Sequence, residues 1–337
     1  MRDFLLRPIC DATGGDDGAS LAGGPISFKR VETLGYDRSS RRLPLKSLSP
    51  DALAGFTSPR ASVLGVSMDF PRIMGVLNIT PDSFSDGGSD ASAEAAVARG
   101  LKLIEDGADF LDIGGESTRP GAKPVSLAEE QDRVLPVIEG LKAAGITAPI
   151  SIDTRNAVTA QVAFEAGAQL FNDVSALSHD PDSLAFAAES GATVCLMHAL
   201  GDLRTMQDDP TYKNVLIDIF AYLEGRIEVC LEAGISRDKI IVDPGIGFGK
   251  TLQHNVTILS GLSAFQGMGV PVLIGASRKG FIGKLSGEAI AANRAPGSIA
   301  AALVAAGQGA QIIRAHDVAE TRQALTVWTA ASGLWDI

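Results

Sequence analysis

Eight short apolar runs alternate with longer amphipathic stretches, and this alternation limits the fold of the chain more than any other feature. The runs lie at residues 72–78, 110–114, 149–153, 170–173, 193–198, 240–243, 272–276 and 311–316. Between them, segments such as 91–107 and 127–144 place Ala, Val, Leu and Ile at helical spacing. Several end in glycine, at Gly107, Gly167, Gly191 and Gly234, as helices often do. Short apolar strands that alternate with helices predict a parallel sheet with the helices outside.

The number of these units favours one closed barrel. Eight strand-and-helix units in about 265 residues fit a (β/α)8 TIM barrel of the α/β class better than an open doubly wound sheet. Residues 1–70 lack the alternation and are rich in Gly, Ser, Pro and Arg, with apolar fragments such as 61–66 that could pair as a β-hairpin. We therefore expect a short irregular or β-rich extension over residues 1–70 and a barrel over residues 71–337.

Charge and cysteine usage exclude several classes of partner. The net charge is −11 and the isoelectric point is near 4.9, whereas nucleic acids and anionic membranes attract basic surfaces. No run of about 18 apolar residues indicates a membrane span. Cys10, Cys195 and Cys230 show no metal-ligand spacing, which fits a reducing cytoplasm. We expect a cytoplasmic protein that binds neither nucleic acid nor membrane and that holds any anionic ligand with local basic groups.

Polar side chains stand at or beside the carboxyl end of every predicted strand, where the active sites of this fold gather. In chain order they are Asn78; Asp112 and Glu116; Asp153; Asn172 and Asp173; His198; Asp243; Ser277, Arg278 and Lys279; and Arg314 and His316. Each one alone is more often a helix N-cap or a surface group than a functional residue. All eight strand ends together would converge on one mouth of the barrel, which indicates a binding site.

A glycine-rich segment after the sixth strand imitates a phosphate-binding loop. Residues 244–251 read Pro-Gly-Ile-Gly-Phe-Gly-Lys-Thr, and Pro244 occupies the position of the first glycine of that motif. The match therefore fails, and nucleotide binding is not expected. Glycines that adopt positive φ and let the backbone approach a flat ligand explain the segment better.

Seven segments resemble dihydropteroate synthase, a family of pterin-binding enzymes of folate synthesis, and they occur in the family's order. The most specific is Asn-Ile-Thr-Pro-Asp-Ser-Phe-Ser-Asp-Gly-Gly at residues 78–88. The others are residues 115–121, 151–154, 172–173, 243–248, 277–279 and 314–317. The resemblance implies a transferase on a (β/α)8 barrel that forms a homodimer, uses Mg²⁺ and is the target of sulfonamides. Its substrates would be 6-hydroxymethyl-7,8-dihydropterin pyrophosphate and 4-aminobenzoate, and its products 7,8-dihydropteroate and pyrophosphate.

The resemblance also implies a role for individual residues. The pterin contacts are Asp153, Asn172, Asp243 and Lys279. The pyrophosphate contacts are Asn78, Thr118, Ser277, Arg314 and His316, and Asn78 is also the Mg²⁺ ligand. The 4-aminobenzoate slot consists of Phe84, Thr118, Arg119, Pro120, Phe248 and Ser277. The catalytic set is Asp153, Lys279 and Asp86.

These residue types suit the implied chemistry. A pterin offers an amino group and a ring N–H on one edge, which a buried carboxylate such as Asp243 can accept, while Asn172 carries both a donor and an acceptor. Pyrophosphate leaves first and the amine attacks second, with Asp153 stabilising the cationic pterin between the two steps. An aromatic amine is neutral at pH 7 and needs no strong base. One departure is Gly280, where some relatives carry a Ser thought to help hold the aminobenzoate carboxylate.

Two other functions use the same kind of site. A pterin-dependent methyltransferase with a corrinoid partner would share the barrel and the Asp and Asn side chains that bind the pterin. It would not need the Arg119-Pro120 loop or the anion site of Arg314 and His316. A non-catalytic pterin-binding paralogue would have lost residues from the loops, and none is lost here. For residues 1–70, two interpretations stay open: packing under the barrel, or contact with a neighbouring folate enzyme or the dimer mate.

Overall fold

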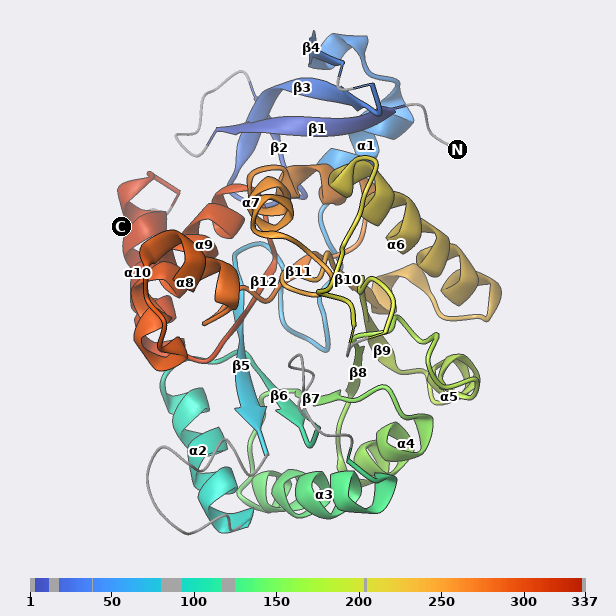
Figure 1. Ribbon diagram of the computed structural model, residues 1–337, viewed down its shortest axis with the longest axis vertical. Coiled ribbons are helices and arrows are strands. Elements are labelled where there is room, and N and C mark those ends of the chain that lie inside the picture. The colour runs from blue at the N-terminus through green and yellow to red at the C-terminus, as the bar shows by residue number, and fades with distance from the viewer. Residues whose placement is uncertain are drawn as a thin grey trace.

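Eight parallel strands surround a single axis in the computed structural model, which describes residues 4–11, 18–37, 39–79, 93–116, 125–202 and 205–334 (Figure 1). They are β5 (Arg72–Asn78), β6 (Phe110–Gly114), β7 (Ile150–Asp153), β8 (Leu170–Asp173), β9 (Thr193–Met197), β10 (Ile240–Asp243), β11 (Leu273–Ile274) and β12 (Ile312–Ala315). The sheet order β10-β9-β8-β7-β6-β5-β12-β11 closes through a parallel bridge between Val242 and Val272. The predicted (β/α)8 barrel is confirmed.

Helices cover the outside of this barrel (Figure 1). They are α2 (Ala93–Glu105), α3 (Leu127–Ala143), α4 (Ala157–Ala166), α5 (Ser183–Glu189), α6 (Val215–Glu232), α7 (Leu252–Ser260), α8 (Gly280–Ser286), α9 (Ala295–Gly307) and α10 (Val318–Ala331). Side chains of Ser126, Asn214 and Thr251 cap three of their N-termini. The predicted glycines that follow helices have positive φ, for example 118° at Gly167. No single described helix is long and apolar enough to cross a membrane, although the bent pair Gly280–Ser286 and Ala291–Gly307 passes that test jointly.

The interior of the barrel changes from apolar to polar along the strands. Its amino-terminal layer is Met74, Phe110, Leu170, Cys195, Ile241, Leu273 and Ile312, which form one buried cluster. Residues two positions further along a strand point to the same side of the sheet. Those positions hold Val76, Asp112, Asn172, Met197, Asp243, Gly275 and Arg314. The strand period therefore places an apolar floor beneath a polar mouth.

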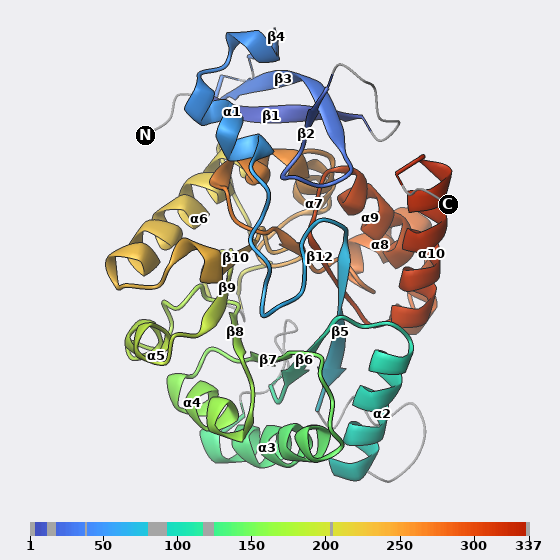
Figure 2. The same ribbon diagram turned by 180° about the vertical axis from the view of Figure 1, so that it is seen from behind.

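The N-terminal extension forms a small antiparallel sheet on the outside of the barrel (Figures 1 and 2). Its elements are β1 (Phe4–Asp11), β2 (Ala19–Ser20), β3 (Ser27–Gly35), β4 (Ser40–Pro44), the 3-10 helix η1 (Leu45–Ser47) and α1 (Pro50–Thr57). The sheet lies against the 3-10 helix η4 (Leu262–Met268), and Ser263 Oγ donates to the carbonyl of Pro8 at 2.8 Å. Its own core consists of Leu21, Ile26, Phe28, Val31 and Phe56. The sequence predicts a short irregular or β-rich extension here, and the structure adds the order and pairing of its strands.

Residues that follow α1 seal the amino-terminal end of the barrel. Val63 and Val66 pair as a short antiparallel bridge, within the segment 61–66 that the sequence marks as able to pair as a hairpin. Val63 and Met68 are buried in the same cluster as the floor of the barrel. The buried Arg60 guanidinium donates to the carbonyl of Gln266 in η4 at 2.6 Å. This end is closed by apolar packing, so the open end lies at the carboxyl ends of the strands.

Candidate active site at the carboxyl ends of the strands

Arg314 of β12 joins two carboxylates across the mouth of the barrel. Its Nε donates to Asp112 Oδ2 at 2.6 Å, and its Nη2 donates to Asp153 Oδ2 at 2.7 Å. Burial alone would lower the pKa of Arg314, but Asp112, Asp153 and Asp243 raise it above the ordinary value. Burial raises the pKa of Asp153 to about 7, against the opposing effect of Arg314. The site thus holds a permanent cation beside a carboxyl group that changes charge near neutral pH.

Asn172 of β8 is bonded to the same buried carboxylate. Its Nδ2 donates to Asp112 Oδ1 at 3.3 Å and to Asp112 Oδ2 at 3.2 Å. Asp112 is 0% exposed and Asn172 is 7% exposed, so the pair is shielded from bulk water. A buried polar pair of this kind is stable because each group satisfies the other.

Asp243 and Lys279 form the opposite side of the mouth. Asp243 lies at the end of β10 and accepts the backbone N–H of Gly245 at 2.7 Å. Burial raises its pKa, although Lys279 and other donors oppose that rise. Lys279 Nζ donates to the carbonyl of Ile246 and lies 4.6 Å from the centroid of the Phe248 ring. Burial lowers the pKa of Lys279 to about 8.

Gly275, directly after β11, lies between this side and Arg314. A Cβ added at Gly275 would lie 3.7 Å from Arg314 Cδ and 3.9 Å from Asp243 Oδ2. The absence of a side chain therefore lets the guanidinium stem and the carboxylate approach each other. The predicted pterin contacts Asp153, Asn172, Asp243 and Lys279 are thus gathered around one guanidinium.

The loop after β10 has the backbone that its glycines predict. Gly245, Gly247 and Gly249 have φ of 72°, 85° and 64°. A Cβ at Gly245 would stand 2.0 Å from the carbonyl oxygen of His198, so only glycine fits there. The buried Lys250 Nζ fastens this loop to β9: it contacts His198 Nδ1 at 3.0 Å and donates to the Phe248 carbonyl at 2.8 Å. Burial lowers the pKa of His198 to about 3, so its ring is neutral at pH 7.

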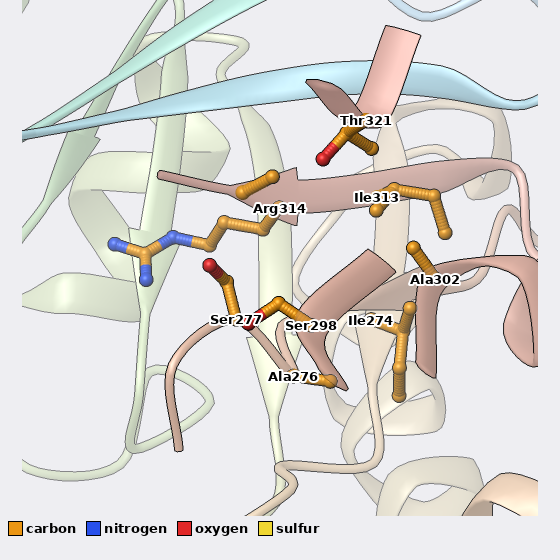
Figure 3. Close-up of a pocket in the computed structure, with 9 residues that line it drawn as sticks. Ile274, Ala276, Ser277, Ser298, Ala302, Ile313, Arg314 and Thr321 are labelled. Carbon is orange, nitrogen blue, oxygen red and sulfur yellow. The ribbon is translucent and has the colours of Figure 1, made fainter. Parts of the chain in front are cut away.

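Ser277, which follows β11, lies beside Arg314 (Figure 3), and His316 directly follows β12. Ser277 Oγ accepts the backbone N–H of His316 at 3.2 Å and is 3.0 Å from His316 Nδ1. In Figure 3, Ser277 and the extended Arg314 lie on one side of a small cavity, and Ile274 and Ile313 line the other. The cavity measures about 10 Å³, which is room for one water at most. It is therefore a packing gap beneath the site rather than a substrate pocket.

The predicted metal ligand Asn78 ends β5 on the same face as Asp153. A Cβ added at Gly114 would lie 3.7 Å from Asn78 Oδ1 and 3.5 Å from Asp153 Cβ. The space that this glycine leaves is bordered by one amide oxygen. Among the described residues, no group of three or more His, Cys, Asp or Glu side chains could hold a metal ion by itself. A cation here would take its remaining ligands from water and from the substrate.

Glu130 of α3 supports the segment that directly follows Asp153. It is 1% exposed, and its carboxylate accepts Thr154 Oγ1 at 2.7 Å, Asn156 Nδ2 at 2.9 Å and Thr159 Oγ1 at 2.7 Å. Sequence reasoning missed this residue because acidic side chains on an amphipathic helix are usually solvated. The only signal was the position of Thr154 and Asn156 directly after a predicted strand end.

The remaining predicted site residues are outside the described part of the chain. They are Phe84, Asp86, Thr118, Arg119 and Pro120. The described residues nearest to them in the chain, Ile79 and Glu116, follow β5 and β6 at the carboxyl side of the barrel. Phe248 and Ser277 of the predicted aminobenzoate slot are described, and both lie next to Lys279 or Arg314.

The fold and the polar mouth are those of a pterin-binding barrel enzyme. The family model described as pterin binding enzyme matches residues 74–316. The chain is 47% identical over 270 residues to dihydropteroate synthase of Neisseria meningitidis serogroup B, covering 79% of this chain and 94% of that protein. The chain therefore belongs to the dihydropteroate synthase family.

Solved structures agree with this assignment. A Xanthomonas albilineans dihydropteroate synthase with 4-aminobenzoic acid is similar at a TM-score of 0.76 and 48% identity, covering 82% of this chain and 98% of that chain. A second structure from that organism, in complex with 7,8-dihydropteroate, gives a TM-score of 0.73 at 44% identity, covering 81% of this chain and 98% of that chain. Since these relatives are covered almost completely, roughly a fifth of this chain has no counterpart in them. The family match begins at residue 74, in β5, so the small N-terminal sheet lies outside it.

Proposed function

We propose that the protein condenses 6-hydroxymethyl-7,8-dihydropterin pyrophosphate with 4-aminobenzoate to give 7,8-dihydropteroate and pyrophosphate. It is a transferase of the dihydropteroate synthase family. The observation that carries the assignment to this site is the ring of polar groups at the strand ends, in which Arg314 joins Asp112 to Asp153. A flat heterocycle with donors and acceptors on its edges can satisfy such groups where water is excluded.

Each side of the ring has a separate task in the proposed pterin complex. Asp243 accepts two N–H groups of the pterin edge, and Lys279 donates to the ring carbonyl and N5. Because burial lowers the pKa of Lys279 to about 8, its ammonium group predominates at neutral pH and can donate. Phe248, held over Lys279 by the loop that Lys250 fastens, forms one wall of the aminobenzoate slot.

Loss of pyrophosphate before attack by the amine requires that the cationic pterin be stabilised. Asp153 supplies negative charge next to the ring when it is ionised. Arg314, Ser277 and His316 lie where barrels often bind phosphate groups, after the seventh and eighth strands, and would hold the departing pyrophosphate. The residues of the two loops outside the described segments, Phe84, Asp86, Thr118, Arg119 and Pro120, complete the slot in this proposal.

Mg²⁺ is proposed to accompany the pyrophosphate. The hard oxygen donor of Asn78, beside the space left by Gly114, fits a cation that keeps most of its ligands as water and phosphate oxygens. Bound there, Mg²⁺ would neutralise charge on the leaving group. The protein's own contribution would be the position of Asn78 at the end of β5.

The assembly and the compartment are part of the proposal. We propose a homodimer in the cytoplasm, with small-molecule substrates as the only other partners. Exposed apolar side chains on or beside α8, α9 and α10 support self-association: Leu285, Ile290, Val304 and Val327 are 61%, 61%, 48% and 62% exposed. The free cysteines Cys10, Cys195 and Cys230 support a reducing compartment.

Two measurements test the assignment. Pyrophosphate release from the purified protein should require both substrates and should fall when Mg²⁺ is removed with a chelator. Calorimetry should show that Asp243→Ala abolishes binding of 6-hydroxymethyl-7,8-dihydropterin without loss of the folded state. Unchanged pterin affinity in that variant would contradict the proposed site even if the protein were a synthase.

A further inference from the structure

Asp112 is a buried carboxylate to which the proposed chemistry gives no task. It lies in the middle of β6, is 0% exposed, and is bonded both to Arg314 Nε and to Asn172 Nδ2. Its partners come from two strands that are distant in the chain, β12 and β8. Asp112 therefore connects the side of the site proposed for pyrophosphate to the side proposed for the pterin.

The chemistry of Asp112 fixes the orientation of the Asn172 amide. An ionised carboxylate has only acceptor atoms, whereas an amide has an acceptor oxygen and a donor nitrogen. Asn172 must therefore turn its Nδ2 toward Asp112, as the distances of 3.2 and 3.3 Å record. In the described part of the chain, no donor is bonded to Asn172 Oδ1. The atom left for a ligand is an acceptor.

We propose that Asp112 is a positioning residue that sets the hydrogen-bonding polarity of the pterin site by holding Asn172 with its amide oxygen toward the substrate. The inference rests on the proposed function and deepens it. Asn172 then reads an N–H donor of the pterin, either the 2-amino group or N8–H, rather than a ring nitrogen lone pair. A heterocycle that presents an acceptor at this position is rejected because two acceptors face each other.

The substitution Asp112→Asn reverses this polarity while conserving the number of bonds. The new carboxamide oxygen can still accept Arg314 Nε, and its NH2 group can donate to Asn172, which turns over and presents Nδ2 to the ligand. A merely structural role predicts little change in ligand affinity. The proposed role predicts that affinity for 6-hydroxymethyl-7,8-dihydropterin falls roughly 10- to 100-fold, as expected when a buried hydrogen bond is replaced by a mismatch.

The double substitution Asp112→Asn with Asn172→Asp provides the matched rescue. It restores an amide paired with a carboxylate, keeps the net charge of the unmodified protein, and again turns an acceptor oxygen toward the ligand. Calorimetry should show pterin affinity within about threefold of that of the unmodified protein. The two substitutions compensate each other because the residues belong to one hydrogen-bond network. Thermal unfolding of both variants reports whether the fold is intact.

The outcomes separate this inference from the proposed function. If the unmodified protein binds no pterin, the proposed function fails. If it binds pterin and Asp112→Asn binds equally well, only the proposed positioning role of Asp112 is overturned. A double variant that does not recover pterin affinity also overturns that role. If neither variant folds, a crystal structure of the unmodified protein with the pterin decides. A pterin N–H within hydrogen-bond distance of Asn172 supports the inference, and a ring lone pair there refutes it.

Discussion

Replacing the buried Glu130 with alanine should destabilise the protein and disturb its proposed active site together. The carboxylate accepts three hydrogen bonds, from Thr154, Asn156 and Thr159, and Glu130 is only 1% exposed. Hydrogen bonds to a charged acceptor contribute about 1.5 kcal/mol each at the lower end of their range, so the three together give a loss of about 4 to 5 kcal/mol. Urea denaturation measures this free energy of unfolding.

The neighbouring Glu129 is the matched control. It lies on the same helix, but its side chain is 54% exposed and pairs with Arg133, one turn further along. Glu129→Ala should change the free energy of unfolding by no more than about 0.5 kcal/mol. Because Thr154 follows Asp153 directly, Glu130→Ala should also lower kcat/KM, whereas Glu129→Ala should not. Equal and small effects of the two substitutions would refute the reasoning about the buried carboxylate.

Three further predictions concern pH and the glycines of the site. Burial raises the pKa of Asp153 to about 7 and lowers that of Lys279 to about 8. With increasing pH, kcat/KM should therefore rise as Asp153 loses its proton and fall as Lys279 loses its own. If kcat/KM of the Asp153→Asn variant still rose between acidic and neutral pH, the assignment of that rise to Asp153 would be contradicted. Gly245→Ala would put a Cβ 2.0 Å from the His198 carbonyl at a φ of 72°. It should cost more than about 2 kcal/mol in urea denaturation, whereas Gly234→Ala, with open space around it, should cost only about 1 kcal/mol. At the start of α8, a Cβ added at Gly280 meets no atom within 4 Å. Gly280→Ser should therefore leave the stability unchanged and lower the KM for 4-aminobenzoate. A lower melting temperature would show that the space is not free.

The barrel and its polar mouth could be predicted because both depend on short-range pattern. Each strand is an apolar run of a few residues, and the side-chain period of two places Asp112, Asn172 and Arg314 on the inner face. The positive φ of Gly245 and Gly247 was likewise expected from a local motif. No tertiary information was needed for these features.

The pairings inside the mouth could not be predicted, because they depend on the closure of the barrel. Arg314 and Asp112 are 202 residues apart in the chain, and nothing local distinguishes Asp112 from the other Asp residues near strand ends, such as Asp173. The Glu130 network depends on the packing of α3 against the loop after β7, which no periodicity reveals. The strands of the N-terminal extension could be predicted only as a short irregular or β-rich segment, because β3 carries no strict alternation: its exposed Lys29 and Arg30 are adjacent.

The most direct test of the proposed synthase activity is the stoichiometry of its products. The purified protein, given 6-hydroxymethyl-7,8-dihydropterin pyrophosphate, 4-aminobenzoate and Mg²⁺, should form 7,8-dihydropteroate and pyrophosphate in equal amounts, as followed by mass spectrometry and a phosphate-coupled assay. A methyltransferase or a non-catalytic binder would take up the pterin and form no dihydropteroate. Tight pterin binding without this product would contradict the account.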